Sequence, residues 1–136
     1  MAKHPQCTSI PPYQDEKTGM WYQVVNRGAI KPNYLETSGS AIFAYAVIKS
    51  VLLGFLDESY FAYGQEAFDG ICESYLSGEN GELQLDGICL VAGLGNEAMR
   101  QGTFDYYMQE PIVKNKTRGV APLILAYIEI LFRVEG

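Results

Sequence analysis

One segment of the chain is almost wholly apolar, and it follows directly after a group of small polar side chains. The sequence NYLETSGSAIFAYA, residues 33–46, places Thr37, Ser38 and Ser40 at the start of this segment. The hydroxyl of Thr37 or Ser38 can accept a hydrogen bond from a free amide of a first helical turn, and Gly54 is a typical residue at a helix end. The pattern predicts a helix from Thr37 or Ser38 to about Gly54. Its apolar side chains surround the helix axis, which indicates neighbours on nearly every side.

The next segment, residues 57–76, is predicted to form an amphipathic outer helix. Asp57 is a candidate N-cap, and Glu58 places a carboxylate in the first turn, where it suits the helix dipole. Acidic residues separate the positions that recur at helical spacing. Those positions are Phe61, Ala62, Gln65, Phe68, Ile71, Cys72, Tyr75 and Leu76. We expect the two segments to form an antiparallel helical hairpin with a short connection.

A last helix is predicted from Thr117, with Pro122 in its first turns, where the missing amide costs little. It begins with the same order of residue types as the helix eighty residues earlier. Thr37, Gly39, Ala41, Ala46 and Ile48 correspond to Thr117, Gly119, Ala121, Ala126 and Ile128. This agreement is typical of parallel inner helices in a repeated helical-hairpin array, where each hairpin covers its neighbour. Chance agreement among common residue types is the alternative.

The rest of the chain is predicted to be mainly loop. Prolines exclude a long helix in residues 1–33 and leave a turn at residues 15–19, followed by the short extended piece MWYQVV. Residues 79–81 indicate another turn, and residues 82–91 alternate enough for a small β-hairpin or an extended loop. Residues 96–119 lack a clear period and predict a long loop. The expected fold class is therefore all-α, with a small β-hairpin and a long loop as insertions.

The length of 136 residues allows one domain, residues 1–136, of which we expect residues 1–14 to be irregular. The formal net charge of -6, without a run of Lys or Arg, argues against a nucleic-acid partner. The start lacks the apolar core of a secretory signal. The longest apolar stretch, residues 41–56, is interrupted and shorter than the ~20 residues that a membrane span needs. These features predict a cytoplasmic protein with no membrane partner.

Cysteine and histidine usage limits the chemistry available to the chain. Cys7, Cys72 and Cys89 are far apart and odd in number, which favours reduced, mostly buried thiols over a disulfide framework or a zinc cluster. His4 is the only histidine, and it lies in a proline-flanked N-terminus, so a histidine-based metal site or catalytic triad is excluded. We expect no metal ion and no cofactor.

Several motifs together resemble the C-terminal part of glycoside hydrolase family 105, the unsaturated rhamnogalacturonyl hydrolases, which are related to family 88. The motifs are GxWYQVV at Gly19–Val25, NYLETSGSAIFAYA at Asn33–Ala46, GICLVAGLG at Gly87–Gly95, YYMQEP at Tyr106–Pro111 and RGVAPLILAYIEI at Arg118–Ile130. They occur in order and at plausible spacing, and the resemblance covers about residues 13–133. Any one of these motifs would be a weak signal alone.

The resemblance implies an (α/α)6 barrel, in which six helical hairpins surround a central pocket. A complete barrel of this kind is much longer than this chain. The chain therefore corresponds to the last two or three hairpins, about half of the ring.

The resemblance also implies an activity. Family members remove a 4,5-unsaturated uronic acid from the non-reducing end of pectin-derived oligosaccharides. An Asp protonates the vinyl ether and then activates water, without a covalent intermediate. The family's catalytic Asp, pocket His and Arg/Trp segment precede the part seen here, and no position of this chain matches them. Asp15, Asp57, Asp69, Asp86 and Asp105 do not fill these places. We therefore expect no catalytic residue here and no glycosidase activity from this chain alone.

Candidate binding residues follow from the expected pocket rim. The N-termini of inner helices lie there in such a barrel, so amides and hydroxyls can hold a uronate carboxylate or a sugar hydroxyl, aromatic faces can stack on sugar rings, and cations can attract a uronate. The candidate substrate-binding residues are Tyr34, Glu36, Thr37, Ser38, Tyr107, Lys116 and Arg118. Each also has a structural interpretation. The residues of positions 36–38 can cap a helix, the tyrosines can pack in a core, and the cations can be solvated loop charges.

Two functions of different classes remain open. The first is a fragment or truncated form of an unsaturated uronyl hydrolase, which contributes a wall of the sugar pocket and binds an unsaturated uronic-acid oligosaccharide when the full barrel is present. The second is a non-catalytic helical-array module for binding or assembly, which forms a homodimer through its open barrel edge. A half-barrel exposes the apolar flanks of its inner helices, so we expect self-association or poor solubility.

Overall fold

The computed structural model describes residues 9–95 and 100–135, and it is mostly helical, as predicted. The helices are α1 (Thr37–Leu52), α2 (Phe61–Tyr75), the short α3 (Phe104–Gln109) and α4 (Thr117–Glu135), and 3-10 turns occur at Pro11–Tyr13, Val25–Arg27 and Glu58–Tyr60. The strands are β1 (Leu76–Glu79), β2 (Glu82–Leu85), β3 (Ile88–Cys89) and β4 (Ile112–Val113), which form the antiparallel pairs β1–β2 and β3–β4. No helix in these ranges is both long and apolar enough to cross a bilayer.

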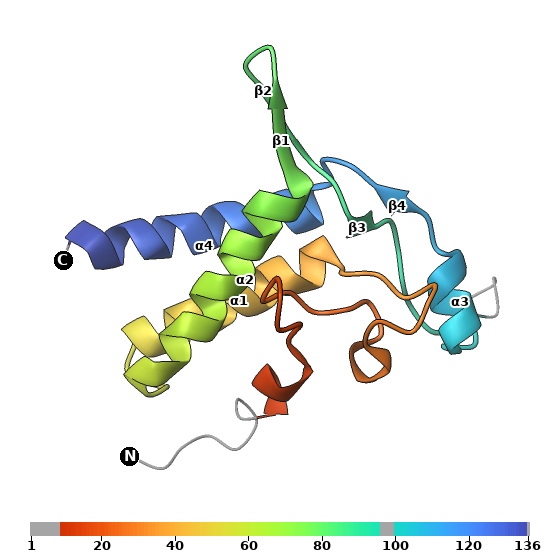
Figure 1. Cartoon of the computed structure of the whole chain (residues 1–136), viewed down its shortest axis with the longest axis horizontal. Helices are drawn as coiled ribbons and strands as arrows, with labels where there is room; N and C mark the ends of the chain where they lie inside the picture. The colour runs from red at the N-terminus through yellow and green to blue at the C-terminus, as the bar shows by residue number, and fades with distance from the viewer. Residues whose placement is uncertain (1–8, 96–99, 136) are drawn as a thin grey trace.

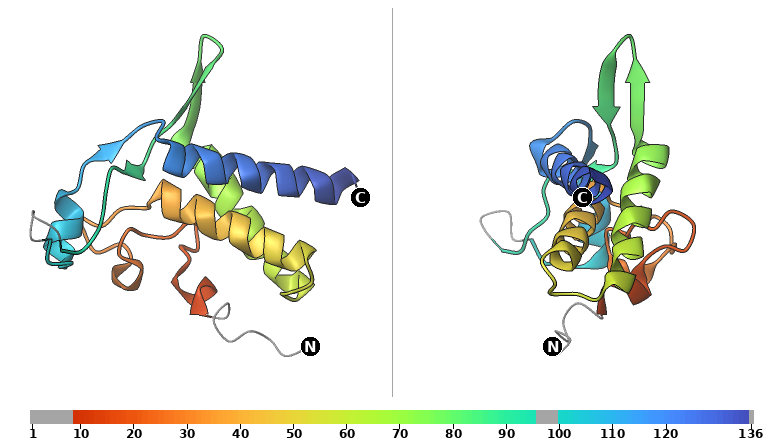
Figure 2. Two further views of the ribbon diagram at one scale, coloured as in Figure 1. Left: turned by 180° about the vertical axis from the view of Figure 1, so that it is seen from behind. Right: turned by 90° about the vertical axis from the view of Figure 1, so that its left-hand side faces the viewer.

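Helices α1 and α4 lie side by side and run in the same direction, while α2 returns antiparallel along one side of the pair (Figures 1 and 2). The register of α1 against α4 follows the sequence repeat. Lys49 Nζ and Glu129 Oε1, which belong to residues eighty apart, form a salt bridge at 2.8 Å. The predicted helical hairpin and the predicted parallel course of the first and last long helices are both confirmed.

The bounds of α1 agree with the sequence, but its cap does not. The helix begins at Thr37, as predicted, and the chain turns away through Gly54, whose φ of 74° suits glycine. The N-cap is the side chain of Glu36, so the prediction that a hydroxyl of Thr37 or Ser38 caps the helix is wrong. The expected neighbours are present on part of the helix surface only, since Ile42 is 49% exposed.

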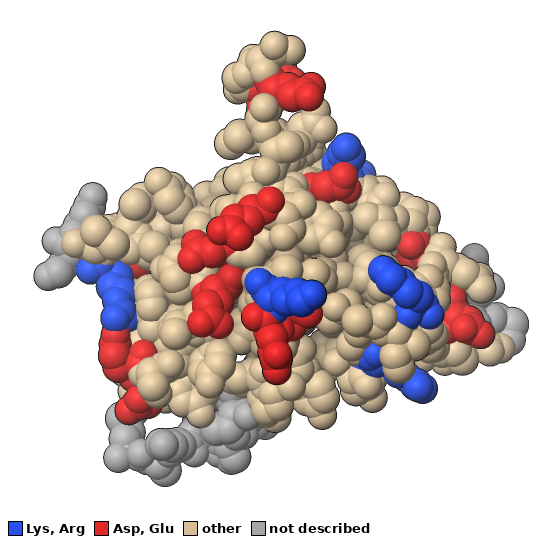
Figure 3. Space-filling model, viewed as in Figure 1, with Lys and Arg blue, Asp and Glu red and all other residues tan. Residues whose placement is uncertain are grey.

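Helix α2 packs on α1 through small residues. Gly64, Ala67 and Gly70 are buried, whereas Ala62, which the periodicity assigned to the buried face, is exposed. A Cβ atom on Gly64 would lie 2.6 Å from Cγ1 of Ile48, so the close approach of the two helices depends on glycine. The acidic side chains of α2 gather on the outer face of the molecule (Figure 3), in agreement with the predicted outer helix.

The small sheets differ from the sequence-based expectation. The hairpin lies at residues 76–85, earlier than predicted, and projects from the helices (Figure 1). Its turn uses Asn80 and Gly81 with φ values of 53° and 81°, and a two-residue hairpin turn of type I′ requires positive φ at both positions. Strand β3 pairs with β4, which lies more than twenty residues further along the chain. The expected long loop at residues 96–119 therefore contains α3 and β4 within its described part, and that expectation is wrong there.

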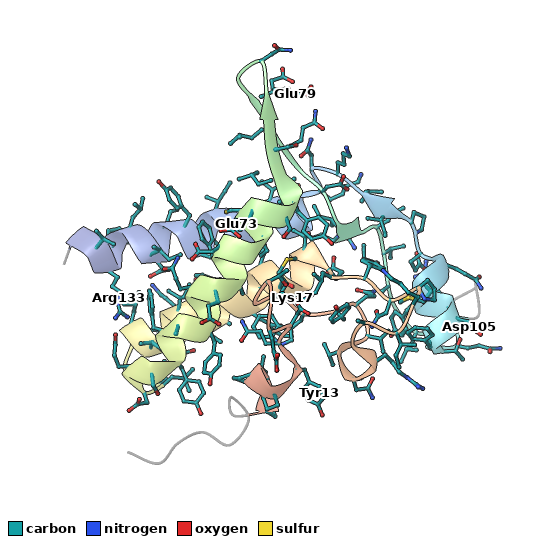
Figure 4. The ribbon with its side chains drawn as sticks, in the orientation of Figure 1. Tyr13, Lys17, Glu73, Glu79, Asp105 and Arg133 are labelled. Atoms are coloured by element: carbon teal, nitrogen blue, oxygen red, sulfur yellow. The ribbon has the colours of Figure 1, made fainter. Side chains whose placement is uncertain are left out.

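The end of α4 is fastened to the start of the α2 segment. Arg133 forms a salt bridge with Glu58, and its guanidinium lies 3.7 Å from the centre of the Phe61 ring (Figure 4). This cation–π contact and the Lys49–Glu129 pair fix α4 at two points along its axis, so that it stays parallel to α1.

We predict that Gly70→Ala destabilises the fold. A Cβ atom at this position would lie 1.7 Å from the carbonyl oxygen of Thr18, a backbone atom that cannot move without displacing the N-terminal segment. The expected loss is about 2–3 kcal/mol in the free energy of unfolding, measured by urea denaturation. Gly78→Ala is the matched control, because its Cβ would make only an ordinary contact of 3.4 Å with Leu83. Equal stability of the two variants would contradict the close approach of the Thr18 carbonyl to Gly70.

Candidate functional site

The N-termini of α1 and α4 lie beside each other at one end of the helical pair (Figures 1 and 2). A Cβ atom on Gly119 of α4 would lie 3.7 Å from Cβ of Ser38 in α1 and 2.7 Å from Cδ1 of Ile88 in β3. Glycine therefore allows the start of α4 to approach both elements. Polar side chains predicted from the sequence to bind substrate gather around these helix starts, and this end of the molecule is the candidate site.

Glu36 holds this end together through a carboxylate that is only 6% exposed. Its Oε1 atom accepts hydrogen bonds from the Ser38 amide at 3.1 Å, the Ser38 hydroxyl at 2.7 Å and the Cys89 amide at 2.9 Å. Its Oε2 atom accepts from the Gly39 amide at 2.6 Å. The amides of Ser38 and Gly39 have no partner within the helix, so the carboxylate caps α1 and also joins it to β3.

Because Glu36 caps α1, fewer hydrogen-bonding groups at the start of this helix are available to a ligand. The amides of Ser38 and Gly39 already face an anion, so they are not available to hold the carboxylate of a uronic acid. A carboxylate only accepts hydrogen bonds, so the Ser38 hydroxyl donates to Glu36 and keeps its lone pairs for another donor. The hypothesis that free amides of α1 bind a uronate is therefore wrong for this helix. Ser38 is 9% exposed, and its hydroxyl oxygen can accept one further hydrogen bond.

Thr37 and Ser40 serve the packing of α1. Thr37 is fully buried, its amide donates to the Gly87 carbonyl at 2.9 Å, and its hydroxyl donates to the Asp86 carbonyl at 2.8 Å. Ser40 is also fully buried, and its hydroxyl oxygen accepts from the Trp21 amide at 2.9 Å. Both hydroxyls fasten neighbouring segments to the helix, and neither is exposed to a ligand.

Tyr34 lies close to Cys89 and Glu36. Its hydroxyl is buried without a hydrogen bond of ordinary geometry, and the thiol of Cys89 beside it is at most a weak partner. Burial raises the pKa of the Tyr34 hydroxyl well above its usual value, and the neighbouring Cys89 and Glu36 add to the effect. Burial likewise raises the pKa of the Cys89 thiol, with the Glu36 and Glu110 carboxylates contributing. Both groups therefore stay protonated and neutral near pH 7.

The remaining candidates are more exposed. Lys116 and Arg118 flank the start of α4, and both side chains are exposed. In the eighty-residue repeat Lys116 takes the position of Glu36 and Arg118 that of Ser38, so the two helix starts carry opposite charge. Tyr107 is half-buried in α3, where its ring is tilted against that of Tyr106 at 5.2 Å between centroids. The structure thus groups Glu36, Ser38 and Tyr34 closely and leaves Tyr107 in a separate aromatic pair.

Sequence reasoning missed two partners of this cluster. The amide of Cys89 reaches Glu36 from 53 residues away, and a backbone donor leaves no mark in the sequence. Gln23 donates from Nε2 to the Cys89 sulfur at 3.5 Å, and its place in the GxWYQ motif is the one signal that pointed to it. Across residues 9–95 and 100–135, no group of three or more His, Cys, Asp or Glu side chains is placed to hold a metal ion.

Comparison with known proteins gives consistent matches. The family model described as Glycosyl Hydrolase Family 88 matches residues 3–134. A 24.9 kDa protein in the picA locus of Rhizobium radiobacter and a protein of Agrobacterium fabrum (strain C58) are each 40% identical over 122 residues, which is 85% of this chain and 52% of the relative. The chain therefore spans about half the length of these relatives.

Solved structures agree with this result. A Clostridium acetobutylicum glycoside hydrolase from family 105 is 42% identical, with a TM-score of 0.86 over 90% of this chain and 34% of that protein. A possible member of the family from Salmonella enterica is 26% identical, with a TM-score of 0.75 over 95% of this chain and 30% of that protein. The chain thus spans about a third of these structures.

We predict that Glu36→Gln strongly destabilises the candidate site. The amide group of Gln would turn a donor toward the amides of Ser38, Gly39 or Cys89, which are donors themselves. The expected cost is about 3 kcal/mol in the free energy of unfolding, measured by urea denaturation. Glu66→Gln on the exposed face of α2 is the matched control and should change stability by less than about 0.5 kcal/mol. If both variants unfold at the same urea concentration, the cap does not have the importance assigned to it.

Proposed function

Since this chain belongs to glycosyl hydrolase family 88, we propose that it forms part of the pocket wall in an (α/α)6 barrel that hydrolyses unsaturated uronic-acid oligosaccharides derived from pectin. Helices α1 and α4 are two inner helices of this barrel, and their N-termini lie at the pocket rim. The observation that carries the proposal is the parallel α1–α4 pair, whose polar starts lie at one end and whose fold matches a family 105 hydrolase with a TM-score of 0.86.

The two helix starts divide the recognition of the sugar between them. Ser38, held by Glu36, accepts a hydrogen bond from a sugar hydroxyl. Tyr34 supports this site from below, because its hydroxyl is buried. Glu36 itself repels a carboxylate. The start of α4 has no acidic residue at the capping position and carries Lys116 and Arg118 instead, so its field favours the uronate. Tyr107 contributes an aromatic face from α3.

The acid and base of the reaction come from outside this chain in the proposed enzyme. Asp15 accepts hydrogen bonds from the Thr18 amide and hydroxyl. Asp86 forms a salt bridge with Lys114 at 3.3 Å and accepts a hydrogen bond from the Gly87 amide. The other aspartates have comparable duties or full exposure. Asp57 caps a 3-10 turn, Asp69 accepts from Gln65, and Asp105 lies at the outer end of the molecule on α3 (Figure 4). A general acid needs a free carboxyl group facing the substrate, and none of these five has that setting.

We predict that this chain alone does not hydrolyse unsaturated galacturonyl-rhamnose, because the group that protonates the vinyl ether is absent from it. The measurement is the loss of ultraviolet absorbance of the C4–C5 double bond. The positive control is a chimera in which this chain replaces the matching third of the Clostridium acetobutylicum hydrolase. Its kcat/KM should lie within about tenfold of the parent enzyme, a barrier change of about 1.4 kcal/mol. Turnover by the isolated chain would contradict the proposal.

A second candidate function is an assembly module that forms a homodimer through the open barrel edge. The observation that favours it is the apolar flank of α4, where Leu125 is 42%, Ile128 38% and Phe132 65% exposed. Neighbouring apolar side chains on one helix face form a patch of the kind that marks an interaction surface. An incomplete hydrolase of this family would expose the same apolar flank of α4. The flank therefore does not distinguish the two functions, whereas a test of hydrolytic activity does.

We predict that the isolated chain self-associates at high concentration and that the double variant I128E/F132E is monomeric. Two charges in the middle of the apolar flank would have to be buried unpaired in any association through it. Sedimentation velocity across a concentration series measures the effect. Ile30→Glu, at a 59% exposed position in the N-terminal segment, is the control and should behave as the unmodified chain. A compact monomer at every concentration would contradict the open-edge interpretation.

A further inference from the structure

A hollow of about 460 Å³ lies on the N-terminal segment, between the turn at residues 12–17 and the turn at residues 25–29. We call it the N-terminal hollow. Its wall combines two aromatic rings with charged, amide and apolar side chains, and none of them belongs to the starts of α1 and α4. Its principal polar groups come from Tyr13, Asp15, Glu16, Lys17, Tyr22 and Asn26.

Both walls of the N-terminal hollow are held in place by the rest of the fold. Asn33, which is only 3% exposed, donates from Nδ2 to the Val24 carbonyl at 3.0 Å and to the Gly28 carbonyl at 2.7 Å, and so fixes one turn. On the other wall, Gln14 donates from Nε2 to the Tyr63 carbonyl of α2 at 2.9 Å. A ligand therefore meets a site whose backbone is already ordered, which lowers the entropic cost of binding.

The Asp15 carboxylate is oriented so that one of its oxygens remains open to a ligand. Its Oδ2 atom accepts hydrogen bonds from the Thr18 amide at 3.0 Å and the Thr18 hydroxyl at 2.8 Å. Its Oδ1 atom accepts a long hydrogen bond, at 3.4 Å, from the Tyr22 hydroxyl. Burial, with Asp15, raises the pKa of the Tyr22 hydroxyl, which therefore stays a donor near pH 7. Asp15 Oδ1 can accept a further and shorter bond from a ligand hydroxyl.

The other polar side chains of the N-terminal hollow are free to bind a ligand. Within the part of the chain that the structure describes, the side chains of Glu16, Lys17 and Asn26 form no hydrogen bond or ion pair. Together they offer a carboxylate acceptor, an ammonium donor and an amide with both functions. Tyr13 adds a ring that is 48% exposed, and it projects with Lys17 from the same segment (Figure 4).

This combination of groups matches a neutral sugar. Each sugar hydroxyl both donates and accepts hydrogen bonds, and a C–H face of the ring can pack on an aromatic side chain. A uronate is disfavoured, because Asp15 and Glu16 outnumber Lys17 in the wall and the whole chain carries a formal charge of -6. Lys17 in turn disfavours a cationic ligand. We propose that the N-terminal hollow binds a neutral saccharide unit, at a site separate from the helix starts of α1 and α4.

The N-terminal hollow is connected to the candidate site through the backbone. Tyr22, which lines it, forms an antiparallel bridge with Leu35, the residue directly before Glu36. A neutral unit in the hollow can therefore belong to the same oligosaccharide as the uronate that the start of α4 favours. Only this connection rests on the proposed function. Binding of a neutral sugar to the hollow requires no hydrolysis and can be measured on this chain alone.

The experiment measures saturation-transfer NMR signals of the methyl glycosides of galactose and rhamnose with the isolated chain, and of D-galacturonate as the charged probe. We expect at least one neutral glycoside to bind with a Kd of about 1–10 mM, and galacturonate about fivefold more weakly. The double variant Y13A/N26A should weaken binding of the neutral glycoside by about tenfold. Tyr63→Ala, which removes a 38% exposed tyrosine outside the hollow, is the matched control and should retain binding.

Lys17→Gln separates a neutral ligand from a charged one. It removes the ammonium charge and keeps a hydrogen-bond donor, so binding of the neutral glycoside should change by less than about twofold. Circular dichroism and urea denaturation of all variants check that the fold is intact, as the exposure of Asn26 and Lys17 leads us to expect.

Three outcomes would overturn the proposal. The first is the absence of saturation transfer to both neutral glycosides. The second is unchanged binding in a correctly folded Y13A/N26A variant, which would place the sugar elsewhere on the chain. The third is tighter binding of galacturonate than of either neutral glycoside, together with its loss in Lys17→Gln. Neutral-sugar binding that persists while the chimera fails to hydrolyse its substrate would count against the proposed function alone.

Discussion

The buried carboxylate of Glu36 is the interaction on which the arrangement of this end of the molecule depends. Four hydrogen bonds reach it, from the first turn of α1 and from the Cys89 amide in β3. The Glu36 amide in turn donates to the Trp21 carbonyl at 2.9 Å, so the same residue also fixes the N-terminal segment. A buried charge is stable only when its hydrogen bonds are complete. Three segments distant in sequence must therefore fold together for α1 to begin at Thr37.

This constraint also explains why two helices with the same entry sequence behave differently. The carboxylate of Glu36 accepts hydrogen bonds from the first amides of α1. The corresponding position before α4 is the exposed Lys116. An anion near α4 would meet a positive helix end and a cation, but near α1 it would meet a carboxylate. The two helix starts thus pack closely, since a Cβ atom on Gly119 would lie 3.7 Å from Cβ of Ser38, but they differ in their electrostatics.

The sequence predicted the long helices well because their signals are local. Apolar periodicity, Gly54 and the repeat gave α1 and α4, and the acidic stripe gave the outer face of α2. The Glu36 cap, the β3–β4 pair and the short α3 were missed or only left open as alternatives. Each depends on a partner far along the chain, as in the Cys89 amide that reaches Glu36. The buried face of α2 was misjudged because Gly64 and Gly70 carry no hydrophobic signal. Gly64 allows α1 to approach α2 closely, and Gly70 allows the Thr18 carbonyl to do so.

The unequal cover of α1 and α4 shows how a helical array with an open side can still be ordered. Helix α1 has α2 on one side and α4 on another, and its buried Ala41, Ala44 and Ile48 form the centre of the packing. Helix α4 is covered on the side of Ala126 only, yet it keeps its direction because Glu129 and Arg133 fasten it at separate heights. These contacts position the helix without burying its outer faces. Association with further helices along the open flank of α4 would bury its exposed apolar side chains and so add stability.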